Sequence, residues 1–339
     1  MVSDDRALRN FVDELQLAAE RAREATQTDE TWLSLAEHPV QLRIAGASLQ
    51  ARSIPALAHL VARPSVSSLT VEGWDRNETG VAPPPPPVSL DAPLLRGGAR
   101  EMIERDVRMT YDSWMRMLCV YDGSRARAFV TVADAAQIPA WVDRAPLRTI
   151  FTWWAGDTGL AFLHASAVAC GDGAIVLAGA SGSGKSTTAM ACFADGLDFI
   201  ADDACLVRLD PEPTVFTVYG KAKLERDAFD RLPQLGELAF DARGASVVID
   251  TSERVVPSAP LRAVALPTLT DGRRSRLTRV SPTWARRLLV RTTLVEGGAG
   301  GAALGPITDL AGRVPCYRLE LGSDLTDVVS TVRAVLGAA

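Results

Sequence analysis

The stretch Gly179-Ala180-Ser181-Gly182-Ser183-Gly184-Lys185-Ser186-Thr187 decides how the rest of the chain is interpreted. It fits G-x-x-x-x-G-K-S with a further threonine, the complete pattern of a phosphate-binding loop. Residues 174–178 before it are an apolar, β-branched run typical of a buried strand, and residues 187–193 after it lack Pro and Gly, which favours a helix. Strand, loop and helix in this order predict a nucleoside triphosphate site. The weaker alternative is a glycine-rich turn without a ligand.

The residue types of the loop explain how it would hold phosphate. Glycines let the backbone curl so that successive N–H groups face phosphate oxygens, and a helix that begins near Lys185 directs its positive end at the same anion. The Lys185 ammonium would reach the β- and γ-phosphates, and the Ser186 hydroxyl would bind Mg²⁺. We therefore expect ATP and Mg²⁺ as cofactors. The expected nucleotide-binding residues are Gly179, Ser181, Gly182, Ser183, Gly184, Lys185, Ser186 and Thr187.

Composition limits the class of protein. A chain of 339 residues with 47% apolar and 23% charged residues forms one large or two ordinary globular domains. Its net charge of −5 argues against a nucleic-acid partner. The five cysteines show no C-x-x-C pair, which favours buried thiols in a reducing compartment over a zinc site. The polar start and the absence of a membrane-length apolar run predict a cytoplasmic protein without a membrane partner.

Residues 1–135 predict an N-terminal mixed α/β domain, which we expect to help select the substrate. Apolar residues at three- and four-residue spacing predict a helix over 6–25. Strands are expected at 40–44 and 69–71, with a short helix at 54–61 between them, and a hairpin joins 114–121 to 127–132 through Asp122-Gly123. The five prolines at 83–87 form an extended spacer or, less favoured, a segment recognised by an aromatic groove.

Residues 136–339 predict a second α/β domain that holds the loop. An aromatic stripe over 141–154 indicates a core helix, and Gly171-Asp172-Gly173 a tight turn before the loop strand. The stretch 221–244 looks irregular, and the glycine-rich stretch 296–305 is a flap or, more simply, a flexible connection. Other expected strands are 163–168, 197–201, 205–209, 215–219, 246–249, 262–266 and 316–321, and helices 282–295 and 325–336.

Two aspartates and a histidine are the next candidates for chemistry. Asp202 and Asp203 follow an apolar run, and carboxylates at the end of such a strand face the ligand crevice of an α/β sheet. One could hold Mg²⁺ while the other accepts a proton or orients water; the alternative is an exposed turn. His164 precedes the loop strand closely enough to approach the phosphates, although a lone histidine is more often structural.

These features together resemble the catalytic domain of HPr kinase/phosphorylase. That family has a His-Gly segment, a G-x-S-G-x-G-K-S loop and an Ala-Asp-Asp strand end. His164-Ala-Ser, the loop and Ala201-Asp202-Asp203 match them with the same separations and without gaps. The match covers about 45 residues well and the rest of the C-terminal half loosely. The resemblance implies a P-loop-containing, HPr kinase-like catalytic domain over 136–339, behind the mixed α/β N-terminal domain.

The resemblance also implies roles for single residues. Lys185 and Ser186 would bind phosphates and Mg²⁺. Asp202 would be the general base that deprotonates the acceptor hydroxyl, Asp203 would support Mg²⁺ binding, and His164 would assist beside them. The implied catalytic residues are thus Asp202, His164 and Lys185, and the implied metal ligands Ser186 and Asp203.

Two departures from the family narrow the expectation. Thr187 stands where bifunctional members carry Glu, and residues 218–223 (VYGKAK) lack their R-G-L-G signature. The reverse reaction, phosphorolysis of phosphoserine, is therefore not expected. The pattern looks closer to the kinase-only relatives found beside bacterial peptide natural-product genes, including those of lasso peptides. Because members of the family are often oligomers, the resemblance implies a homo-oligomer as one option.

The expected function is transfer of the γ-phosphate of ATP to an alcohol, most simply a Ser or Thr hydroxyl of a peptide or small protein. A kinase of a small-molecule hydroxyl, such as free serine or a sugar, remains open. A nucleotide-dependent switch or assembly ATPase is the alternative from another class. The third option, a scaffold with a vestigial loop, is disfavoured by the intact Lys185-Ser186 pair.

Overall fold

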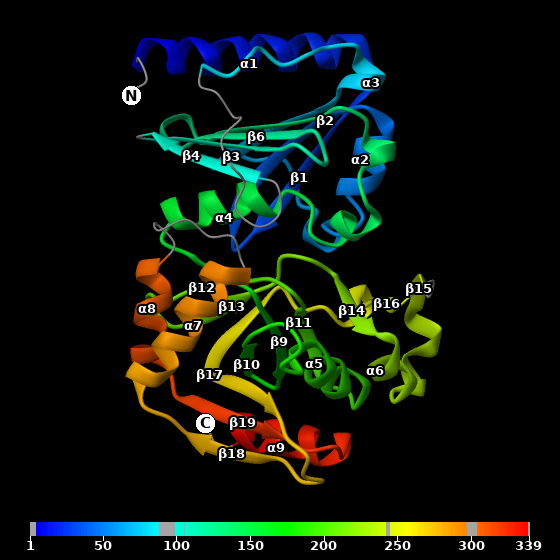
Figure 1. Cartoon of the computed structure of the whole chain (residues 1–339), viewed down its shortest axis with the longest axis vertical. Coiled ribbons are helices and arrows are strands. Elements are labelled where there is room, and N and C mark those ends of the chain that lie inside the picture. Colours follow the sequence, from blue (N-terminus) through cyan, green and yellow to red (C-terminus); the bar gives the residue numbers. More distant parts are fainter. Residues whose placement is uncertain (1–4, 88–98, 105, 242–244, 297–303, 338–339) are drawn as a thin grey trace. The chain divides into compact units, whose positions relative to one another are not determined.

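The computed structural model describes residues 5–87, 99–104, 106–241, 245–296 and 304–337, and the chain forms two compact units, Met1–Trp154 and Ala155–Ala339 (Figure 1). Both units combine sheets with helices, so the chain is a mixed α/β protein. Within the described ranges, no helix is both long and apolar enough to cross a bilayer.

The first unit contains a seven-stranded sheet in the order β1-β2-β3-β7-β6-β5-β4. Its strands are β1 (Thr28–Leu35), β2 (His38–Ala45), β3 (Leu69–Asp75), β4 (Ala99–Glu104), β5 (Val107–Asp112), β6 (Met117–Asp122) and β7 (Arg127–Val132). The pairs β2–β3 and β3–β7 are parallel and the other four are antiparallel. The predicted hairpin is therefore present as β6 and β7.

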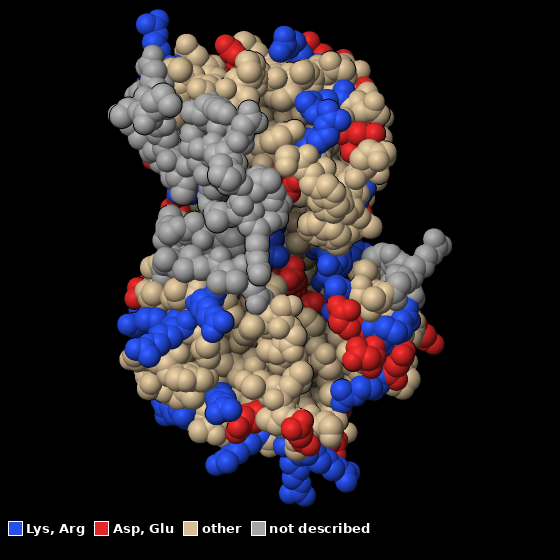
Figure 2. All heavy atoms as spheres, viewed as in Figure 1, with Lys and Arg blue, Asp and Glu red and all other residues tan. Residues whose placement is uncertain are grey.

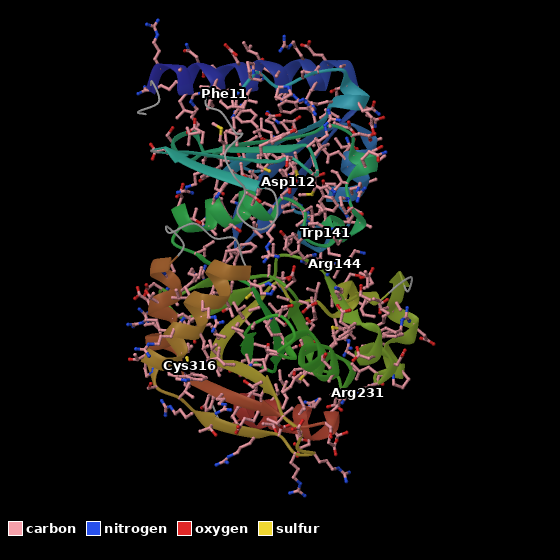
Figure 3. All side chains as sticks on the ribbon, in the orientation of Figure 1. Phe11, Asp112, Trp141, Arg144, Arg231 and Cys316 are labelled. Carbon is pink, nitrogen blue, oxygen red and sulfur yellow. The ribbon has the colours of Figure 1, made fainter. Side chains whose placement is uncertain are left out.

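Helices cover both faces of this sheet. The helix α1 (Asp5–Ala25) lies across one face and α4 (Arg148–Asp157) across the other (Figure 1). Leu8, Phe11 and Leu15 of α1 are buried in one apolar cluster with Trp74 and Phe129 of the sheet, as their three- and four-residue spacing predicts. Figure 3 shows Phe11 beneath α1 on its sheet side. The short helices α2 (Ala47–Ser53) and α3 (Arg76–Thr79) follow β2 and β3.

Residues 136–154, which the sequence placed in the second domain, belong to the first unit. Polar contacts attach them there. The Arg52 guanidinium donates to Asp143 Oδ1 and to the Ala135 carbonyl, each at 2.8 Å. Arg108 donates to the carbonyl of Trp153 at 2.8 Å. The sequence-based boundary between residues 135 and 136 was placed where the predicted hairpin ends. Contacts between residues far apart in the chain, such as these, leave no local signal in the sequence.

The second unit is built on a nine-stranded sheet in the order β11-β9-β10-β17-β13-β12-β8, with β19 paired to β17 and β18. The strands are β8 (Ala161–Leu163), β9 (Ala165–Cys170), β10 (Gly173–Ala178), β11 (Asp198–Ala201), β12 (Cys205–Arg208), β13 (Thr214–Phe216), β17 (Ser258–Leu269), β18 (Arg276–Arg279) and β19 (Cys316–Leu321). The loop strand β10 runs parallel to β17 and antiparallel to β9.

Helices pack on both sides of this sheet as well. Side chains of β10 alternate: Ala174, Val176 and Ala178 join the cluster with α7 (Pro282–Glu296) and α8 (Leu304–Arg313). Ile175 and Leu177 join the opposite cluster with α5 (Lys185–Ala194) and α9 (Leu325–Gly337). The central strand is therefore apolar throughout because both of its faces are covered. Figure 2 shows Lys and Arg side chains interspersed with Asp and Glu on the visible face of this unit.

Three expectations need correction. The stretch expected to be irregular contains β14 (Lys221–Glu225), α6 (Arg226–Asp230) and β15 (Ala239–Asp241), and β14 and β15 pair with β16 (Ser246–Asp250). Ala222 and Leu224 of β14 are buried, so the stretch does alternate with a period of two. Instead of the helix at 54–61 there are turns and one 3-10 turn, Ala58–Leu60. The predicted strand 163–168 is interrupted at His164. Most of the glycine-rich stretch 296–305 lies outside the described residues.

Candidate active site

The loop strand, its neighbours and the loop meet at one edge of the sheet. Ala178, the last residue of β10, pairs with Ala165, the first residue of β9. Ala201, the last residue of β11, pairs with Ala167. The residues that follow or precede these positions therefore emerge together, namely the loop from Gly179, the aspartates from Asp202, and His164. The register of three adjacent strands thus gathers the sequence-predicted residues into one region.

Two glycines give the loop its path. Gly182 and Gly184 have φ of +76° and +96°, a backbone region that side chains other than Gly rarely adopt. A Cβ at Gly184 would also lie 2.5 Å from Leu321 Cδ1, and Leu321 is buried. A Cβ at Gly179 would lie 2.8 Å from the Ser183 hydroxyl oxygen. The loop therefore requires glycine at 182 and 184, whereas a side chain at 179 would only require the Ser183 hydroxyl to move.

The Lys185 side chain folds back over the first half of the loop. Its ammonium donates to the carbonyl of Gly179 at 2.6 Å and to that of Ala180 at 3.1 Å. The residue is only 6% exposed, although it begins a helix at the end of a surface loop. A buried ammonium held by two carbonyl oxygens is well placed to exchange or share them with phosphate oxygens.

The first turn of α5 is open to an anion. Its N-cap is Gly184, which offers no side chain to the helix N–H groups. Within the described ranges, the Ser183 hydroxyl is buried without a hydrogen-bond partner. Ser186 and Thr187 are half-buried in this first turn, and Ser181 is exposed. Unsatisfied N–H groups, a helix N-terminus and a buried cation together fit a bound phosphate group. With a phosphate group bound here, the Ser186 hydroxyl would also suit Mg²⁺, which takes oxygen ligands and retains water.

Asp202 is held by the protein itself. It is 3% exposed, and both of its oxygens accept hydrogen bonds. Oδ1 accepts from the Ser166 hydroxyl at 2.7 Å, and Oδ2 accepts from the backbone N–H of Lys223 at 2.9 Å. The carboxylate therefore ties the end of β11 to β9 and to β14.

Asp203 is placed differently. Its φ is +71°, in the left-handed region that Asp adopts more readily than most residues. The carboxylate is 35% exposed, and Oδ1 lies 3.1 Å from Nδ1 of His164, which is 13% exposed. The same nitrogen lies 2.9 Å from the carbonyl oxygen of Asp203. Of the two aspartates, Asp203 is the more exposed, and the imidazole of His164 lies against its carboxylate.

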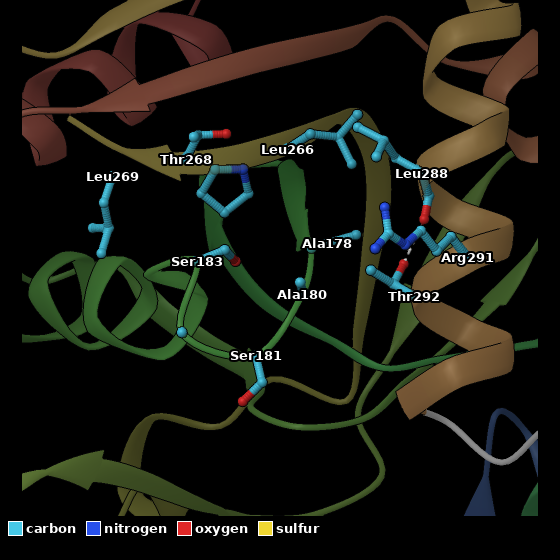
Figure 4. A pocket seen from close by; sticks show the side chains of 13 residues that line it. Ala178, Ala180, Ser181, Ser183, Leu266, Thr268, Leu269, Leu288, Arg291 and Thr292 are labelled. Atoms are coloured by element: carbon cyan, nitrogen blue, oxygen red, sulfur yellow. Dashed lines mark hydrogen bonds between the residues drawn. The ribbon is translucent and has the colours of Figure 1, made fainter.

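A cavity of about 520 Å³ opens beside the first half of the loop (Figure 4). It is lined by the end of β10 and the loop at 178–183, by the end of β17 at 266–269, and by Leu288, Arg291 and Thr292 of α7. In Figure 4 the Arg291 guanidinium extends from α7 toward the loop. Among the described residues that line the cavity, Arg291 alone is charged.

Sequence reasoning missed two contributors to this region. Ser166 stands two residues after His164, and only the pairing of β9 with β11 brings it to Asp202. Arg291 belongs to a predicted helix with several arginines, and the sequence does not reveal which one faces the loop. Two other lysines lie on β14 and form ion pairs with acidic neighbours. Lys221 Nζ lies 3.7 Å from Asp250 Oδ2, and Lys223 Nζ lies 2.7 Å from Glu225 Oε1.

Comparisons with protein-family models and with curated proteins gave no match. Among solved structures, the HPr(Ser) kinase/phosphatase from Coxiella burnetii is similar to this chain at 11% sequence identity and a TM-score of 0.30. The similarity covers 52% of this chain and 92% of that chain. A TM-score of 0.30 is a weak overall likeness. The function proposed below is therefore based on the geometry of the site.

Proposed function

We propose that the protein is an ATP- and Mg²⁺-dependent kinase that transfers the terminal phosphoryl group to an alcohol, a Ser or Thr hydroxyl of a peptide or small protein. The supporting observation is the common sheet edge from which the glycine loop with Lys185 and the His164–Asp203 pair emerge. A phosphate cradle alone fits any nucleotide-binding protein, whereas an accessible carboxylate beside it fits transfer to a hydroxyl.

The nucleotide-binding half of the proposal rests on Lys185, the N–H groups of loop residues 179–184 and the first turn of α5. They would hold the β- and γ-phosphates in one orientation, which supplies much of the catalysis in phosphoryl transfer. Of the two metal ligands that the sequence predicts, we keep Ser186 as the side chain that would hold Mg²⁺ and assign Asp203 to the acceptor instead. When bound, Mg²⁺ would neutralise phosphate charge.

For the acceptor we assign the base to Asp203 in place of Asp202. Asp202 is buried and already accepts two hydrogen bonds, whereas Asp203 is partly exposed. The acceptor oxygen would attack the γ-phosphorus, its O–P bond would form, and the bond from that phosphorus to the bridging oxygen of ADP would break. The hydroxyl proton would pass to the Asp203 carboxylate. His164 would orient that carboxylate, because its Nδ1 lies within 3.1 Å of Oδ1.

The proposal extends to partners. The acceptor would be a peptide, a small protein or a small molecule with a hydroxyl group, and the net charge of −5 disfavours nucleic acid. Assembly into a homo-oligomer and a cytoplasmic location are parts of the proposal that rest on sequence alone.

The direct test is incubation with ATP labelled at the γ-phosphate, Mg²⁺, and a library of Ser- and Thr-containing peptides alongside free serine and sugars. Label in a peptide supports the proposal, and label only in a metabolite moves it to a small-molecule kinase. Release of labelled phosphate without any labelled acceptor would instead support a nucleotide-dependent switch or ATPase. The Asp203→Asn protein serves as the matched control, because it should bind nucleotide but transfer label at least about 10²-fold more slowly.

A further inference from the structure

The cavity beside the loop contains a cation that the proposed mechanism has not used. Arg291 lines it from α7, and its guanidinium extends toward the loop (Figure 4). The surrounding walls are largely apolar, from Leu266, Pro267 and Leu288. Arg291 is exposed, so its guanidinium is accessible to an anion that enters the cavity, and its planar fork suits phosphate oxygens.

The position of the cavity identifies which anion it faces. Its loop residues include Gly179 and Ala180, whose carbonyl oxygens are the two that bind the Lys185 ammonium. In a phosphate loop that ammonium contacts the β- and γ-phosphates, while the helix N–H groups hold the phosphates nearer the nucleoside. The cavity thus adjoins the half of the loop where the outer end of a triphosphate would lie.

We infer that Arg291 contacts the terminal phosphate of a nucleoside triphosphate bound in the loop, an inference that rests on the proposed function. With Lys185 on one side and the α7 guanidinium on the other, the γ-phosphate lies between two cations. Arginine supplied from the same chain stabilises the charge that spreads over the transferred group. ADP lacks this phosphate, so Arg291 discriminates between the triphosphate and the diphosphate.

The test compares two ligands by isothermal titration calorimetry with the full chain and Mg²⁺. AMP-PNP carries the terminal phosphate group and ADP does not. For Arg291→Ala we expect Kd for AMP-PNP to rise by at least about 10-fold and Kd for ADP to change by less than about 2-fold, the range for one charge-assisted contact. Arg291→Lys keeps the charge but not the bidentate geometry, so its Kd for AMP-PNP should fall between those of the wild type and the alanine variant.

Arg287→Ala is the matched control. It removes an exposed arginine from the same helix, one turn earlier, that does not line the cavity, and it should leave both Kd values unchanged. The inference is overturned if Arg291→Ala binds AMP-PNP as tightly as the wild type, or weakens both ligands equally. If the wild type itself binds neither nucleotide, the proposed function fails first and this inference with it.

Discussion

The hydroxyl of Ser166 donates a 2.7 Å hydrogen bond to Oδ1 of Asp202, a buried carboxylate whose second oxygen accepts from the backbone of Lys223. The next residue, Asp203, instead contacts His164 and is partly exposed. Two consecutive aspartates at one strand end therefore have separate tasks. The first fixes the strand end to its neighbours, and the second is available to a ligand.

Removing the charge of Asp202 should cost stability. In Asp202→Asn one hydrogen bond to a charged acceptor is weakened or reversed in a buried site, which we expect to lower the free energy of unfolding by about 2 kcal/mol. Ser166→Ala, which removes the donor alone, should cost about 1 kcal/mol. Urea denaturation measures both. An Asp202→Asn protein with wild-type stability but no phosphoryl transfer would contradict this assignment and return the base to Asp202.

Asp203→Asn, unlike Asp202→Asn, should reduce phosphoryl transfer and leave stability unchanged. Asparagine tolerates the φ of +71° at this position, so the loop conformation and the free energy of unfolding should be retained. The amide cannot accept the acceptor's proton, so the rate of phosphoryl transfer should fall by about 10²- to 10⁴-fold. Single-turnover kinetics and AMP-PNP titration separate these effects. Transfer at the wild-type rate would remove Asp203 from the chemistry.

The local parts of this architecture are predictable from sequence because their signals lie within a few residues. Glycine placement predicts the loop between β10 and α5 and the turn Gly171-Asp172. Apolar periodicity predicts the C-terminal helix α9. The contacts that give the site its chemistry join distant segments. The Ser166–Asp202 bond depends on the register of β9 with β11, and the position of Arg291 depends on how α7 packs on β17.

The misassigned stretch around Lys221 shows the same limit. Its five residues KAKLE alternate, but charged residues occupy the outward positions and a short strand has little intrinsic signal. Pairing with β16 and burial of Ala222 and Leu224 stabilise it as a strand. This pairing in turn positions the Lys223 N–H that binds Asp202.

Replacing the loop glycines by alanine should have graded effects. Gly184→Ala places a methyl 2.5 Å from Leu321 Cδ1 at a φ of +96°, and we expect a loss of about 2–3 kcal/mol together with loss of nucleotide binding. Gly182→Ala, at a φ of +76° with open space around the new methyl, should cost about 1 kcal/mol. Equal losses in urea denaturation of the two variants would show that conformation alone, without contact to Leu321, sets the requirement.

Stability should fall at alkaline pH through the buried thiols. Burial raises the pKa of the Cys205 thiol from 9.0 to about 12. The unfolded chain therefore loses this proton at lower pH than the folded one, so the stabilisation is fully present below pH 9 and is lost as pH rises toward 12. Cys205→Ala removes this titration. Between pH 8 and pH 10, the free energy of unfolding of the variant should therefore fall by about 1 kcal/mol less than that of the wild type. Parallel pH profiles for the two proteins would exclude this source.

The first unit offers a test of whether nucleotide binding belongs to the second unit alone. Glu72, 1% exposed, forms ion pairs with Arg23, with Arg43 at 3.5 Å and with Arg127 at 4.0 Å. Glu72→Gln should lower the free energy of unfolding by about 2 kcal/mol, less than for a fully buried pair because the three guanidinium groups are partly exposed. Glu30→Gln, which removes an exposed partner of Arg43, should cost under about 0.5 kcal/mol. Because the residues that line the cavity beside the loop all lie within 155–339, both variants should bind AMP-PNP like the wild type. A weaker Kd in a folded Glu72→Gln protein would show that the first unit contributes to the nucleotide site.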